Sequence, residues 1–235
     1  MRVTFATQAA PDRANEDFVA ATPDASVLLD GAGTPPGSDS GCSHGVAWYS
    51  RTLGSTLIAS ISQGPNPLPE LVPADSVLVL DITGTPDPTV ICDDREAQVG
   101  ALYRAEMDAL GSGSDTHVSA HRRHVETLRS YRNRDGGFWV AATDPLAAHQ
   151  ALTGNIPADR VRAATLLSDG ASRLVDRFHL ATWREALDTL DQHGPANLIS
   201  TVRAAEHSDP HGERWPRGKT YDDATAAHVS FTSTE

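Results

Sequence analysis

Three acidic residues, each beside a short apolar stretch, have the clearest chemical potential in this chain. The apolar stretch 27–29 runs into Asp30, and the apolar residues 166–167 are followed by Ser168 and Asp169. A third acid, Asp222, stands just before the last apolar stretch of the chain. Short apolar runs bounded by turn residues are typical of buried strands, so each acid should lie at a strand end. We expect the three carboxylates to converge on one metal site.

The type of residue predicts the type of metal. Mg²⁺ and Mn²⁺ prefer oxygen ligands in octahedral geometry and keep several waters, whereas zinc favours closely spaced His or Cys. The two cysteines, Cys42 and Cys92, form no local motif. A glycine directly follows Asp30 and Asp169 and allows a metal to approach the backbone closely. A single Asp-Gly pair is usually a simple turn, but the recurrence of acids at strand ends favours a site for Mn²⁺ or Mg²⁺.

Composition narrows the class of protein. The length of 235 residues favours one domain spanning 1–235 with a sizeable core. The formal net charge is −12. The negative charge argues against nucleic acid or an anionic membrane as the main partner. No apolar run is long enough for a membrane span, and the N-terminus lacks the pattern of a signal peptide. We therefore expect a soluble, cytoplasmic protein.

The elements that must position the acids can be predicted from periodicity. A helix is indicated where apolar residues recur every three to four positions, and a strand where they alternate or run briefly between turn residues. Strands are predicted at 2–7, 18–22, 26–29, 77–80, 89–92, 138–142, 164–168 and 224–231. Helices are predicted at 46–61, 99–110, 118–128, after 144–145, and at 171–178, 183–192 and 196–206. Antiparallel neighbours with helices inserted in pairs predict an α+β fold of packed antiparallel sheets covered by helices.

Four motifs, taken in order, resemble the signature of the metal-dependent protein phosphatases of type 2C. They are Arg-Ala-Asn-Glu-Asp at 13–17, Leu-Asp-Gly-Ala-Gly at 29–33, Leu-Ser-Asp-Gly at 167–170 and Asp-Asp-Ala-Thr at 222–225. The resemblance implies a four-layer α-β-β-α sandwich of two antiparallel sheets flanked by helices. It also implies hydrolysis of phosphoserine and phosphothreonine in protein substrates by a water that two Mn²⁺ or Mg²⁺ ions activate.

The same resemblance assigns the metal ligands by position. Asp30 would bridge both ions, and the carbonyl of Gly31 would bind one of them. Asp169 and Asp222 would bind the other ion. Together with Arg13, Asp30 and Asp169 would form the catalytic set.

Residues around the metals receive roles in the same way. Glu16 and Asp17 would hold metal-bound waters from the outer shell. Arg13 would bind the substrate phosphate, since a guanidinium group matches phosphate oxygens geometrically. Asp81 is the candidate ligand of a third metal, and an ordinary strand end is the alternative interpretation of this residue.

The chain departs from the family pattern at several positions. Many members have a histidine two places after the bridging acid, proposed as the general acid, where this chain has Ala32. Water or His44 would then have to protonate the leaving alcohol. Relatives often carry another acid four places after the second aspartate, where this chain has Arg173. These departures keep two alternatives open: a relative that binds phosphoproteins or a regulator without turnover, and an unrelated acidic metalloenzyme such as a nuclease.

Overall fold

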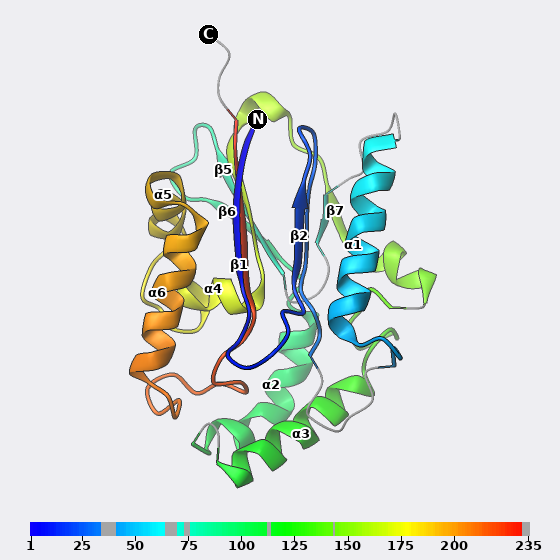
Figure 1. The fold of residues 1–235 in the computed structure, drawn as a ribbon, viewed down its shortest axis with the longest axis vertical. Helices are drawn as coiled ribbons and strands as arrows, with labels where there is room; N and C mark the ends of the chain where they lie inside the picture. Colours follow the sequence, from blue (N-terminus) through cyan, green and yellow to red (C-terminus); the bar gives the residue numbers. More distant parts are fainter. Residues whose placement is uncertain (34–40, 64–69, 73–75, 112–113, 143, 232–235) are drawn as a thin grey trace.

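The structure is a computed structural model in which residues 1–33, 41–63, 70–72, 76–111, 114–142 and 144–231 are described. A five-stranded antiparallel sheet lies at its centre (Figure 1). In spatial order its strands are β1 (Arg2–Gln8), β9 (Ala224–Ser230), β8 (Val161–Leu167), β5 (Val77–Ile82) and β6 (Thr89–Cys92). Every neighbouring pair in this sheet is antiparallel. The predicted α+β class with an antiparallel sheet is confirmed.

One face of the sheet carries the main core. Successive side chains of a strand point to opposite faces, and in β8 Ala163, Thr165 and Leu167 are buried while the residues between them are less so. Leu167 packs in one cluster with Val77 and Val79. The cluster is completed by α4 (Asp169–Asp176), α5 (Trp183–His193) and α6 (Pro195–Ser208), which cover this face (Figure 1).

The boundaries of these helices follow from their capping residues. Thr182 and Glu185 form a reciprocal capping box at the start of α5. Gly194 has a φ of 78°, a conformation that glycine adopts readily, and it separates α5 from α6. Pro195 then occupies the first turn of α6, where its missing N–H costs no helical hydrogen bond.

The opposite face of the sheet is covered by a hairpin and a helix. The hairpin consists of β2 (Phe18–Ala21) and β3 (Ser26–Leu29), and α1 (Val46–Gln63) packs against its outer side (Figure 1). A Cβ atom at Gly54 would lie 2.1 Å from the Phe18 ring, so this glycine allows α1 to approach β2 closely. A third pair of strands, β4 (Glu70–Val72) and β7 (Leu152–Gly154), is also antiparallel. Among the described residues, β2 and β3 form a two-stranded sheet that is separate from the β4–β7 pair.

Two further α-helices lie at one end of the molecule. α2 (Arg95–Asp108) and α3 (Asp115–Arg129) pack against each other below the sheet in Figure 1. Two short 3-10 helices, η1 (Pro145–Gln150) and η2 (Ala158–Arg160), follow, and η1 confirms the short helix predicted after 144–145. No helix in the described part of the chain is both long and apolar enough to cross a membrane.

One predicted element is wrong. Residues 138–142 do not form a strand, because Phe138 makes only an isolated bridge to Arg132. The tight turn between these two residues contains Asn133 and Gly136, both with positive φ. Phe138 is fully buried, and it packs against Leu128 in a small separate cluster. The apolar run reflects burial beneath α3 and not strand pairing.

Candidate functional site

The edge where β8 ends and β9 begins brings two of the predicted acids together. Ser168 follows β8, and its backbone N–H donates to the carbonyl of Thr225 at 3.0 Å. The N–H of Thr225 donates in return to Ser168 Oγ at 2.9 Å. These two bonds place Asp169, the first residue of α4, beside the segment that contains Asp222.

A glycine makes this junction possible. A Cβ atom at Gly170 would lie 1.9 Å from the carbonyl oxygen of Asp223. Any side chain at this position would therefore push the start of α4 away from the chain that enters β9. The Asp-Gly pair at 169–170 has a structural reason in addition to the chemical one predicted from sequence.

The third acid joins the first two through a backbone hydrogen bond. Asp30 follows β3, and its Oδ2 atom accepts from the N–H of Asp169 at 2.9 Å. Gly31 lies against the loop 11–17, because a Cβ atom there would be 2.3 Å from the carbonyl oxygen of Glu16. The structure therefore brings Asp30, Gly31 and Asp169 together, as the sequence predicts.

Two further acids, Asp17 and Asp223, fix the loop that precedes β2 through hydrogen bonds. Asp17 is 7% exposed; its carboxylate accepts from the N–H of Gly31 at 3.4 Å and from the Thr225 hydroxyl at 2.7 Å. Asp223 accepts from the N–H groups of Ala10 and Glu16, both at 2.8 Å. Asp17 is engaged within the protein, and burial raises the pKa of its carboxyl despite these hydrogen bonds.

Asp222 is paired with two basic side chains. Lys219 Nζ lies 2.7 Å from its Oδ1 atom, and the Arg173 guanidinium lies 3.3 Å from its Oδ2 atom. Arg173 also donates to Glu206 at 2.8 Å, and Arg203 donates to the other oxygen of Glu206 at 2.6 Å. Glu206 is fully buried, so this network anchors α4 to α6 as well as to the acid edge.

The charges at this edge are not balanced. Burial and, after it, the negative charge of Asp222 raise the pKa of Asp169 to about 7, although 39% of the Asp169 side chain is exposed. Burial also acts to raise the pKa of Asp222, but Lys219 and Arg173 outweigh it and lower that pKa. Crowded carboxylates resist ionising together, and an added cation removes this penalty.

The donor set fits a hard divalent cation. Among the residues that the structure describes, no three His, Cys, Asp or Glu side chains form a ready-made metal cage. Mg²⁺ does not require one, because proteins usually hold it through one or two carboxylates with several waters. Asp30, Asp169, Asp222 and the Gly31 carbonyl are all oxygen donors at one edge of the sheet, so they would hold Mg²⁺ or Mn²⁺.

Glu16 and Arg13 flank the acids. A Cβ atom at Gly33 would lie 2.7 Å from Glu16 Oε2 and 3.5 Å from Lys219 Nζ, which places all three groups together. Burial raises the pKa of Glu16, and the positive charge of Arg13 opposes that rise. Arg13 is exposed in the loop 11–17. Its guanidinium is therefore solvent-accessible beside the acidic edge.

Asp81 is not brought to this edge. In the register of β5 with β8, Val77 pairs with Leu167 near the acids, whereas Asp81 pairs with Ala163. Asp81 comes four positions after Val77 in the strand, a distance of about 13 Å. The sequence-based assignment of Asp81 as a third-metal ligand is therefore corrected, because Asp81 lies near the opposite end of the sheet from the other acids.

Asp81 has basic partners of its own. Its carboxylate accepts from Arg162 Nε at 2.9 Å and from Arg184 at 2.8 Å. Hydrogen bonds from Arg162 and then from Arg184 lower the pKa of Asp81 to about 2, against the effect of burial. His44, considered from sequence as a general acid, is exposed and stacks on Trp48 with ring centroids 4.4 Å apart.

Sequence reasoning missed Lys219 and the bracing role of Asp223. Lys219 carried one signal, since it is the only lysine among 19 basic Lys and Arg residues. Asp223 had only its place next to Asp222. Its bonds to Ala10 and Glu16 span more than 200 residues of sequence, and no local pattern reveals them.

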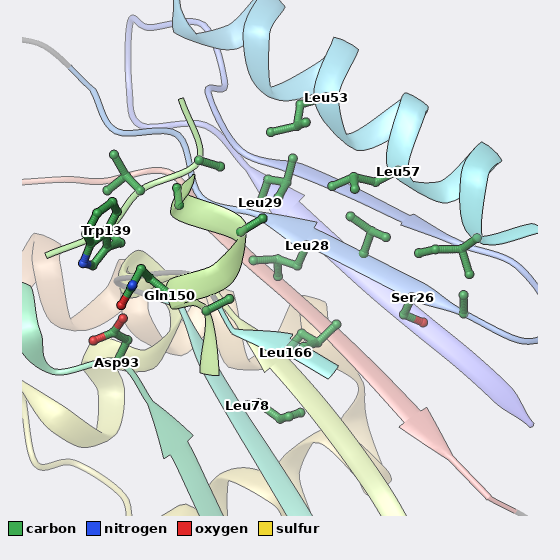
Figure 2. A pocket seen from close by; sticks show the side chains of 18 of the residues that line it. Ser26, Leu28, Leu29, Leu53, Leu57, Leu78, Asp93, Trp139, Gln150 and Leu166 are labelled. Carbon is green, nitrogen blue, oxygen red and sulfur yellow. The ribbon is translucent and has the colours of Figure 1, made fainter. Parts of the chain in front are cut away.

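A separate cavity of about 550 Å³ lies between α1, β3 and the sheet. Leu28, Leu53, Leu57, Leu78 and Leu166 line it, and Figure 2 shows their side chains pointing toward one another. The side chains of Asp93, Trp139 and Gln150 lie together at one end, and that of Ser26 lies toward the other (Figure 2). None of the four candidate metal ligands, Asp30, Gly31, Asp169 and Asp222, is part of its lining. Its walls are mainly aliphatic and offer hydrophobic contact, whereas the candidate metal ligands lie at the acidic edge.

Comparisons with known proteins neither support nor oppose this assignment. No family model matches the chain, and no curated protein matches it. The resemblance to type 2C phosphatases therefore rests on the four motifs and on the way the structure brings their residues together.

Proposed function

We propose that this chain is a phosphatase that depends on Mn²⁺ or Mg²⁺ and acts on phosphoserine or phosphothreonine proteins. The supporting observation is the convergence of Asp30, Asp169 and Asp222 at one sheet edge, with Arg13 beside them. These residues come from widely separated parts of the chain, in the order that the family resemblance requires. We include in the proposal the four-layer sandwich, which the stacking of helices, sheet, hairpin and α1 supports.

The chain's own groups have distinct tasks in this reaction. When bound, the divalent ions would polarise phosphoryl oxygens and make a water more acidic. Asp30 is held in place by the N–H of Asp169, so its carboxylate is oriented before any ligand arrives. Arg13 would donate two parallel hydrogen bonds to the phosphate. Ala32 contributes no proton, so we assign protonation of the leaving alcohol to water.

The test is hydrolysis of p-nitrophenyl phosphate and of a phosphothreonine peptide. We expect activity that disappears with a chelator and returns with Mn²⁺. Asp169→Asn should reduce it roughly a hundredfold or more, because a metal supplies several kcal/mol of charge stabilisation. Asp81→Asn is the matched control, since this aspartate lies near the other end of the same sheet. Full activity in Asp169→Asn, or an equal loss in both variants, would contradict the proposed site.

A second function is favoured by one observation. Lys219 and Arg173 already contact both carboxylate oxygens of Asp222, so the site has cations of its own. Such a site could bind a phosphoprotein through Arg13 without turnover. Saturable binding of the phosphothreonine peptide in the presence of a chelator, with no hydrolysis when Mn²⁺ is added, would establish this alternative in place of the phosphatase.

A further inference from the structure

Lys219 stands out by its residue type. The chain contains 19 Lys and Arg residues in total, and Lys219 is the only lysine. Arginine forms rigid, forked hydrogen bonds, whereas lysine places a compact charge on a flexible four-carbon stem. The chain therefore uses its single compact, movable cation at the acidic edge.

The surroundings of the Lys219 ammonium are those expected for a bound cation. It contacts Asp222 at 2.7 Å, and its charge also interacts with Asp169 and Asp30. Burial acts to lower the pKa of Lys219, but the negative charges of Asp222 and Asp169 outweigh it and raise that pKa. The ammonium is therefore positively charged at neutral pH, and it interacts with all three carboxylates that would hold a metal.

The backbone that carries Lys219 is firmly held. Asp209 accepts from the N–H groups of Glu213 and Trp215 at 2.9 and 3.0 Å, and its carboxylate pairs with Arg217 at 3.0 Å. Arg217 Nε also donates to the carbonyl of Thr220 at 3.1 Å. The segment before and after Lys219 is thus fixed by buried and partly buried hydrogen bonds.

The side chain itself has a route away from the acids. Lys219 keeps 29% of its side chain exposed, whereas Arg173, the other partner of Asp222, keeps 9%. Arg173 is also tied to the fully buried Glu206. Of these two cations, Lys219 is therefore the one that can rotate toward solvent without breaking the core.

We propose that the Lys219 ammonium is a tethered cation that a divalent metal ion must displace from Asp222, so that Lys219 lowers the metal affinity of the site. This inference rests on the proposed metal-dependent function. Lys219 lies at Oδ1 of Asp222 and Arg173 at its Oδ2, so a metal ion that binds this carboxylate is repelled by a positive charge already at contact distance. The metal-free protein thereby keeps its acids partly neutralised, and the site fills only when the metal concentration is high enough to compete.

The decisive experiment observes Lys219 directly during a Mg²⁺ titration. Protein grown with lysine labelled at Cε with ¹³C gives one Hε–Cε cross-peak, because the chain has one lysine. We expect this cross-peak to shift saturably with Mg²⁺, with the midpoint that calorimetry gives for Mg²⁺ binding. A cross-peak that stays in place while calorimetry records Mg²⁺ binding would overturn the inference.

Variants provide the second readout. Lys219→Met should bind Mg²⁺ and Mn²⁺ at least about tenfold more tightly, which is the size of one charge-assisted hydrogen bond expressed as an equilibrium constant. Lys219→Arg retains the charge and should bind metal more weakly than Lys219→Met. Arg214→Met is the matched control, because this exposed arginine lies in the same loop and its guanidinium stacks on Trp215. It should leave metal affinity unchanged.

The outcomes separate this inference from the proposed function. Equal metal affinity in wild type and Lys219→Met, with metal-dependent hydrolysis present, would reject the role of Lys219 and leave the phosphatase proposal intact. Weaker binding in Lys219→Met would also reject it, because the lysine would then support the metal. No metal binding and no hydrolysis in either protein would reject both.

Discussion

The two ends of the central sheet carry similar groups in different electrostatic settings. At one end Asp222 is paired with Lys219 and Arg173, and near the other end Asp81 is paired with Arg162 and Arg184. At the Asp81 end the two arginines stabilise the ionised carboxylate, and the pKa of this carboxyl falls to about 2. At the Asp222 end the surrounding acids leave negative charge in excess.

The difference supports the proposal that the acidic edge is a ligand site and that Asp81 forms a structural ion pair. Asp169 has its pKa raised to about 7 by burial and by Asp222, even though two basic side chains lie nearby. Groups with pKa values shifted in this way gather at functional sites, which supports the proposed metal site at the acidic edge. We therefore assign chemistry to the acidic edge and a structural role to Asp81.

The largest contrast should appear in folding stability. Arg173→Met removes one of the two arginines that pair with the buried Glu206, and because Arg203 remains at 2.6 Å we expect a cost of up to about 3 kcal/mol, the lower end of the range for a broken buried ion pair. Arg184→Met removes a cation whose side chain is 30% exposed, and the expected cost is about 0.2–1 kcal/mol. Urea denaturation of both variants measures the difference. Similar losses would show that the two ends do not differ in the way their burial indicates.

A smaller contrast should appear in the pH dependence of the metal-free protein. The pKa of Asp169 is raised on folding, so the folded state binds its proton more readily, and stability from this group falls as pH rises from about 4 to about 7. The pKa of Asp81 is lowered, so its contribution is lost only as pH falls toward about 2. The exposure of Asp169 screens the effect, and we expect a modest slope.

Urea denaturation in chelator at pH 5 and pH 8 checks this expectation. From pH 5 to pH 8, wild type should lose more stability than Asp169→Asn, because the variant cannot ionise at that position. Asp81→Asn should follow wild type over the same range. A steeper decline in Asp169→Asn than in wild type would mean that the folded protein favours the ionised carboxylate even without a metal.

Sequence patterns predicted the elements well where local signals agree. Alternation predicted β1, short apolar runs between turn residues predicted β3 and β8, and helical spacing predicted α1, α2 and α3. The strand predicted at 138–142 failed because an apolar run records burial and does not reveal its partners. Strand pairing is a tertiary property, and the bridge from Phe138 leads to a turn residue.

The candidate site was partly predictable for the same reason. Asp30 and Asp169 stand at strand ends with adjacent glycines, and the structure brings them together. The position of Asp81 far from the other acids depends on the register of β5 with β8, which no local sequence pattern reveals. The proposed role of Lys219 depends on a loop that Asp209 holds in place through hydrogen bonds. The sequence shows only that Lys219 is the single lysine of the chain.

Calorimetric titration with Mn²⁺ tests the central claim most directly. The account predicts saturable binding to wild type, at least about tenfold weaker binding to Asp169→Asn, and unchanged binding to Asp81→Asn. Circular dichroism of the three proteins verifies that each is folded. Absence of Mn²⁺ binding to the folded wild type, or equal weakening in the two variants, would contradict a metal site at the acidic edge.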